Sequence, residues 1–194
     1  MSRLRQTPSQ TVGPYFAMRL GGEGQNVLVG AETPGQHLRV EGRVIDGDGN
    51  HIEDALVEVW QADAQGRYRH PDDWWTDAPA DEAFTGFGRA WSDFETGDYR
   101  IDTVKPGRVA AADGGLQAPH INVIVQARGM LNPSFTRIYF SDETEANGED
   151  HVLAQVPAER QSTLVAVLEE GAELPTYRFD IRFGGESETV FFDF

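Results

Sequence analysis

Short runs in which apolar and polar residues alternate constrain the fold of this chain more than any other feature. In the run that begins at His37, Leu38, Val40 and Val44 share one side of an extended chain, and charged residues take the other. Because successive side chains of a strand point to opposite faces, this period of two predicts a strand with one buried face. Similar runs recur at Ala55 to Trp60, Tyr99 to Thr103, Ile121 to Val125, Thr136 to Phe140 and Tyr177 to Phe183. This pattern predicts an all-β fold, a β-sandwich of mixed or antiparallel sheets.

Two segments depart from the alternation. Residues 1–36 contain three prolines and six glycines with little periodicity, which predicts an extended N-terminal arm that packs on another surface. Asp142 to Glu170 has helical spacing, with Pro157 in the place of a first helical residue and an apolar face behind it. We expect one helix there, and one or two short helices in all. A chain of this length can bury its own core, so residues 1–194 are expected to form a single domain.

The charge balance limits the partners of the chain. It carries 16 basic and 32 acidic residues, a net charge of -16, which repels nucleic acid and anionic membrane surfaces. A solvated acidic surface that keeps the protein soluble explains the same excess. The sequence has no cysteine, so disulfides and thiolate metal sites are excluded. Its polar beginning and its lack of a long apolar run indicate a cytoplasmic protein.

Two residues are candidates for chemistry. The sequence has no glycine-rich phosphate loop, no Gly-x-Ser-x-Gly elbow and no close pair of histidines with metal-ligand spacing. Tyr68, in the segment GRYRH, and His120, in APHIN, are donors of the kinds that bind ferric iron. Two donors make only half of a coordination shell. On the residues alone, a half-buried loop tyrosine and a hydrogen-bonded histidine at the start of a strand explain them better than a metal site does.

Several separated segments resemble the intradiol ring-cleaving dioxygenases. In chain order they are TPSQTVGPY, VEVWQADAQGRYRH, FGRAWSDFETGDYRIDTVKPG, APHINV and GGESETVFFDF, and the likeness runs from Thr7 to Phe194. In that family a catalytic beta chain holds a non-haem ferric ion with two tyrosines and two histidines, and it can be paired with an alpha chain. The opening and closing segments resemble the alpha type.

Carried over by position, the resemblance leaves half of the ligand set in this chain. Tyr68 and His120 match the first tyrosine and the first histidine, whereas Val109 and Asn122 stand where the second of each would be. Gln117 replaces an arginine that steadies the aromatic ring in catalytic chains. Valine cannot bind a metal ion, and a neutral amide is a poor substitute for imidazole. We therefore expect no iron and no catalytic residue on this chain, and these four ligand positions are vestigial.

The resemblance implies a supporting part in a partner's site. The chain would belong to an oligomer of αβ protomers in which the beta chain binds Fe(III) and cleaves protocatechuate with dioxygen to 3-carboxy-cis,cis-muconate. Thr11, Gly13, Pro14 and Tyr15 in the arm would reach over the pocket of the beta chain. Arg128 would hold the substrate carboxylate, since a guanidinium offers it two parallel donors. On sequence alone, Arg128 is instead a solvated charge at the end of a strand.

Two other functions fit the same residues. One is a sandwich-fold binding or scaffold module that has no catalytic partner. The other is a self-sufficient enzyme whose rearranged metal site uses Tyr68, His70 and His120 with Asp72 or Asp73.

Overall fold

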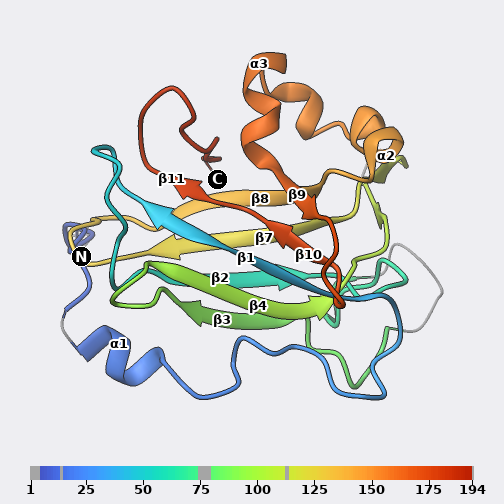
Figure 1. Ribbon diagram of the computed structural model, residues 1–194, viewed down its shortest axis with the longest axis horizontal. Coiled ribbons are helices and arrows are strands. Elements are labelled where there is room, and N and C mark those ends of the chain that lie inside the picture. The colour runs from blue at the N-terminus through green and yellow to red at the C-terminus, as the bar shows by residue number, and fades with distance from the viewer. Residues whose placement is uncertain (1–4, 14, 74–79, 112–113, 194) are drawn as a thin grey trace.

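Figure 1 shows a computed structural model of the protein, which describes residues 5–13, 15–73, 80–111 and 114–193. Within these ranges a nine-stranded mixed sheet has the order β3–β2–β7–β8–β9–β10–β1, and β4 and β11 also pair with β1. The strands are β1 (His37–Ile45), β2 (Leu56–Gln61), β3 (Phe87–Trp91), β4 (Asp98–Val104), β7 (His120–Gln126), β8 (Ser134–Phe140), β9 (Val165–Glu169), β10 (Thr176–Arg178) and β11 (Ile181–Arg182). A small separate ribbon joins β5 (Val109–Ala110) to β6 (Leu116–Gln117).

The large sheet curls on itself, so that β1, β4 and β10 face β2, β7 and β8 across a shared core. The two ends of the sheet, β3 and β4, are joined by residues 92–97, and the Asp93 N–H donates to the Asp98 carbonyl at 2.8 Å. The alternating apolar residues of every predicted strand meet in this core, among them Leu38, Val57, Ile101, Ile121, Ile138 and Tyr177. The predicted all-β, sandwich-like class is therefore confirmed.

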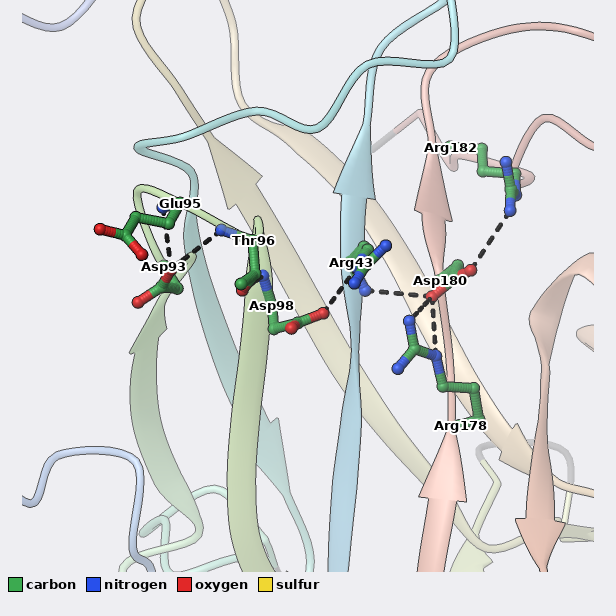
Figure 2. Close-up of polar contacts among 8 residues, drawn as sticks. All are labelled: Arg43, Asp93, Glu95, Thr96, Asp98, Arg178, Asp180 and Arg182. Atoms are coloured by element: carbon green, nitrogen blue, oxygen red, sulfur yellow. Dashed lines mark hydrogen bonds and ion pairs between the residues drawn. The ribbon is translucent and has the colours of Figure 1, made fainter.

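The predicted strand from Tyr177 to Phe183 is divided into β10 and β11, which pair in parallel with successive parts of β1. Asp180 lies in the break and accepts hydrogen bonds from the Arg43 backbone N–H at 3.1 Å and from Arg178 Nε at 3.0 Å. It also accepts one from Arg182 Nη2 at 3.2 Å, as Figure 2 shows. Where the strand is interrupted, the Asp180 carboxylate thus replaces a backbone carbonyl as the acceptor for the β1 backbone N–H.

The single helix expected between Asp142 and Glu170 is wrong. The segment contains α2 (Thr144–Glu149), the 3₁₀ helix η1 (Leu153–Gln155), α3 (Ala158–Gln161), the 3₁₀ helix η2 (Ser162–Leu164) and then strand β9. Strand β9 fills the place between β8 and β10, so sheet pairing of Val167 and Leu168 outweighs their helical spacing. Among the described residues, no helix is long and apolar enough to cross a membrane.

The arm is extended for much of its length, but it also contains a short helix, α1 (Tyr15–Leu20), that the sequence did not indicate. The Phe16 ring meets the edge of Trp91 with centroids 5.0 Å apart, which fixes this helix against β3. Further along, the Leu28 N–H donates to the Asp102 carbonyl at 2.8 Å. Part of the arm therefore packs on the chain's own sheet.

The apolar C-terminal segment also packs on the fold. Phe191 stacks on Phe183 with centroids 4.9 Å apart, and the Phe192 N–H donates to the Phe135 carbonyl at 2.8 Å. Phe192 and Val190 cover a second apolar cluster beneath the short helices. Phe194 lies outside the described residues.

Candidate functional site

A tightly bonded loop after β2 presents Tyr68. The buried Asp63 carboxylate accepts the backbone N–H groups of Gln65 and Arg67, each at 2.9 Å. Asp73 then accepts Arg67 Nε and the Tyr68 N–H, both at 2.8 Å. Because both carboxylates are largely buried and bonded to backbone, they fix the direction in which the Tyr68 side chain leaves the loop.

Gly66 brings this loop against the Lys-Pro-Gly turn that follows β4. Its φ of +81° lies in the left-handed region, and a Cβ there would lie 2.0 Å from the Arg108 carbonyl oxygen. Only glycine combines that conformation with so close an approach. The same turn leads into β5, so Tyr68 and Val109 are carried by neighbouring segments.

Strand β7 places His120 and Asn122 on one face, because they are two residues apart. Their partners across the antiparallel pair with β8 are Tyr139 and Arg137 respectively. The His120 and Tyr139 rings lie with centroids 6.0 Å apart, and Trp60 of β2 stacks on Tyr68 with centroids 5.7 Å apart. Strand pairing thus gathers residues that lie far apart in the sequence.

Tyr68, His120 and Asn122 meet in one pocket, a point that the sequence alone left open. The Tyr68 hydroxyl lies 3.4 Å from His120 Nε2 and accepts Asn122 Nδ2–H at 3.1 Å. The Asn122 amide also donates to the Trp60 carbonyl at 3.2 Å. His120 Nδ1 lies 2.8 Å from the Ala118 carbonyl, to which it donates as the Nδ1–H tautomer, leaving Nε2 as acceptor for the phenol. All three side chains are satisfied by protein groups.

Val109 and Gln117 face each other across the β5–β6 ribbon. Val109 is buried and offers only hydrocarbon. The Gln117 side-chain oxygen accepts Arg137 Nη1–H at 2.9 Å, which ties the ribbon to β8 beside the pocket. At the positions of the second tyrosine and the ring-steadying arginine, the structure therefore has an apolar side chain and an amide already in use.

The electrostatics of the pocket favour neutral groups. Burial, with a smaller contribution from the Arg137 charge, lowers the pKa of His120 from 6.5 to about 4. Burial raises the pKa of the Tyr68 phenol, although the Asn122 hydrogen bond and the Arg137 charge oppose that rise. Tyr68 is therefore a neutral phenol at pH 7, whereas an iron ligand has to be a phenolate.

These residues do not fit a ferric ion. They supply two usable donors, and within the described ranges no group of three or more histidine, aspartate or glutamate residues could hold a metal ion. The rearranged site considered above gains no support: His70 Nδ1 accepts the Asp72 N–H at 3.1 Å, and Asp73 is engaged by Arg67. His70 and Asp72 line an open surface hollow beside Tyr68 and do not close around a shared centre.

The arm and Arg128 form a second cluster at the other end of β7, about 20 Å from His120 by the rise of the strand. The Thr11 hydroxyl accepts the Gly129 N–H at 2.7 Å, so the arm lies directly against the turn that carries Arg128. Arg128 Nε pairs with Asp54, and the Arg128 side chain is 55% exposed. Tyr15 is 76% exposed at the start of α1. Gly13 is exposed too, and Pro14 lies outside the described residues.

Sequence reasoning missed two charged residues of the first pocket. Arg137 borders it from β8, and Asp150, fully buried, holds Tyr139 and the Ala118 backbone next to His120. Arg137 lies on the polar side of a predicted strand, where an arginine needs no explanation. Arg137 can be assigned to the pocket only from the strand register that sets it opposite Asn122. A single sequence does not give that register.

Comparison with known proteins finds relatives over the whole chain. The family model described as Dioxygenase matches residues 11–185. The chain is 44% identical over 204 residues to the protocatechuate 3,4-dioxygenase alpha chain of Burkholderia cepacia, with 100% of each chain covered. It is 33% identical over 172 residues to the beta chain from the same organism, covering 85% of this chain and 72% of that one. A solved intradiol ring-cleavage dioxygenase from Tetranychus urticae has the same fold, with a TM-score of 0.63, 17% identity, and 95% and 97% of the chains covered.

Proposed function

This chain belongs to the intradiol ring-cleavage dioxygenase family, and from that premise we propose that it is the non-catalytic alpha subunit of a protocatechuate 3,4-dioxygenase. The observation that carries the proposal is the likeness to an alpha chain over its full length. The pocket around Tyr68 supports it, since two donors, a valine and an occupied amide do not suit iron. The likeness to a beta chain supports a related partner that carries the metal.

In this proposal the beta chain holds Fe(III), which when bound supplies the oxygenation chemistry that converts protocatechuate and dioxygen to 3-carboxy-cis,cis-muconate. Residues of this chain position substrate from outside that site. The arm, residues 1–36, packs on the partner, and Thr11, Gly13, Pro14 and Tyr15 border the partner's pocket. Two facts support this: the contact of Thr11 with Gly129 holds the arm beside Arg128, and Tyr15 leaves a large aromatic surface exposed.

Iron content of the chain expressed alone, compared with the chain co-expressed with its partner, tests the proposal. We expect no iron, no visible absorbance and no ring cleavage from the lone chain, and a coloured, active complex with the partner, because tyrosinate bound to Fe(III) absorbs visible light. Iron with ring cleavage in the lone chain would instead establish the self-sufficient enzyme. Failure to recover any partner from the native host would favour the scaffold module.

Arg128 is proposed to hold the substrate carboxylate. Its guanidinium is exposed, and the pair with Asp54 uses Nε, which orients the fork of the two Nη groups. We expect Arg128→Ala in the assembled enzyme to raise KM for protocatechuate on the order of tenfold, since a charge-assisted hydrogen bond contributes about 1.5–3 kcal/mol. Steady-state kinetics measure this change.

Catechol, which lacks the carboxylate, provides the control for Arg128. KM for catechol should be the same in the native enzyme and in Arg128→Ala. Arg128→Lys keeps the positive charge and should therefore retain part of the preference for protocatechuate over catechol. An unchanged KM for protocatechuate in Arg128→Ala would remove this role from Arg128 and leave the subunit proposal standing.

A further inference from the structure

The pairing of β7 with β8 places Arg137 beside the residues of the Tyr68–His120 pocket. Arg137 is the cross-strand partner of Asn122, and its neighbour on the same face, Tyr139, is the partner of His120. Side chains opposite each other on one face of an antiparallel pair lie within contact distance. Arg137 Nη1 donates to Gln117 at 2.9 Å and lies 3.4 Å from the Tyr139 hydroxyl, so the guanidinium is held beside the pocket from two sides.

The positive charge of Arg137 lies on the strand face that carries His120 and Asn122. It lowers the pKa of the Tyr68 phenol and disfavours the protonated form of His120. Its Nε is buried and has no hydrogen-bond partner among the described residues, and the two partners of its Nη1 are neutral side chains.

Asp150 is the nearby charge of opposite sign, and it offsets Arg137 only in part. Its carboxylate accepts the backbone N–H groups of Ala118, Val152 and Leu153 at 2.8 to 2.9 Å, as well as the Tyr139 hydroxyl. Its effect on His120 is smaller than that of Arg137. Four protein donors thus already share the negative charge of Asp150, and none of them is Arg137.

We propose that the Arg137 guanidinium is a built-in cation of the Tyr68–His120 pocket, and that its charge excludes metal ions in addition to the loss of two ligands. Like charges at close range in a poorly solvated site repel strongly, and a divalent or trivalent ion doubles or triples that repulsion. Restoring a ligand is then insufficient to restore metal binding. The exclusion is a property of this chain alone and does not depend on the proposed partner.

The test begins from Asn122→His, which adds an imidazole two residues from His120 on the same strand face, beside the Tyr68 hydroxyl. In this background, Arg137 is kept, replaced by Lys, or replaced by Met. Co²⁺ and Zn²⁺ serve as probes, because calorimetry measures their affinity and the visible spectrum of Co²⁺ reports its coordination. We expect Asn122→His with Arg137→Met to bind at least about tenfold more tightly than either variant that keeps the charge.

Equal affinity in the Met and Lys variants, or tight binding by Asn122→His with Arg137 retained, would overturn the proposal. Circular dichroism and thermal unfolding establish that the compared proteins are folded. If Arg137→Met proves unfolded, Arg137→Gln replaces it, because its amide still donates to Gln117 without a charge. A shift in affinity that follows the charge, and not the shape, of residue 137 would distinguish repulsion from altered packing.

Discussion

Replacing Asp150 with alanine is expected to lower the free energy of unfolding by about 4 kcal/mol, since each hydrogen bond contributes about 1 kcal/mol and buried donors are left unpaired. Asp150 is fully buried. One carboxylate oxygen accepts the Ala118 N–H at 2.8 Å, and the other accepts the N–H groups of Val152 and Leu153 and the Tyr139 hydroxyl. The side chain therefore joins the start of β7 to the turn after α2.

Urea unfolding followed by circular dichroism measures this loss, and Tyr139→Phe is the matched control. That variant removes one of the four bonds to Asp150 and should cost about 1 kcal/mol. Asp150→Asn keeps one oxygen as an acceptor and is expected to fall between the two. If Asp150→Ala were no less stable than Tyr139→Phe, the backbone bonds to the carboxylate would contribute little, and β7 would be positioned by packing alone.

Alternation of apolar and polar residues was sufficient to predict most of the sheet. Leu38, Ile101 and Ile138 were assigned to buried faces from their period of two, and each is fully buried. The prediction succeeds because a strand with one face in the core carries its burial pattern in its own sequence. Nothing in such a run says which strands pair, so the joining of β1 to both β10 and β11 could not be predicted.

The helical prediction failed for a related reason. Leu164, Val167 and Leu168 have the spacing of a helix face, but Val165–Glu169 pairs with β8 and β10, and Val167 and Leu168 are exposed. Sheet pairing is a long-range interaction that a local window does not contain. The helix α1 was missed because the glycines and prolines around it conceal a short helix that Phe16 fixes by packing on Trp91.

The residues of the candidate site that are recognisable by their type and motif could be predicted from the sequence. Those that reach the site only through strand register could not. The sequence identified Tyr68, His120 and Asn122, and the structure brings all three together. The roles of Thr11, Gly13, Pro14, Tyr15 and Arg128 depend on a partner chain and remain predictions. The charges of Arg137 and Asp150 could not be foreseen, because their effect comes from strand pairing and burial.

Acid is expected to destabilise the fold through His120. The imidazole is almost fully buried among Tyr68, Asn122 and Tyr139, and it faces the charges of Arg137 and Asp150. Burial first, and Arg137 second, lower its pKa from 6.5 to about 4. Between these values the unfolded chain binds a proton that the folded chain does not, so stability falls as the pH drops from 6.5 toward 4. A difference of this size corresponds to roughly 3 kcal/mol.

The measurement is the free energy of unfolding of the native chain and of His120→Gln at several pH values between 7.5 and 4. The comparison separates the contribution of His120 from that of the many surface carboxylates. Both proteins share the carboxylates, so only the native chain should show the additional loss below pH 6.5. The amide of the variant cannot be protonated in this range, although it can still donate to the Ala118 carbonyl. Parallel pH profiles for the two proteins would mean that His120 accepts a proton in the folded chain as readily as in water, and that the pocket is more open to solvent than its geometry indicates.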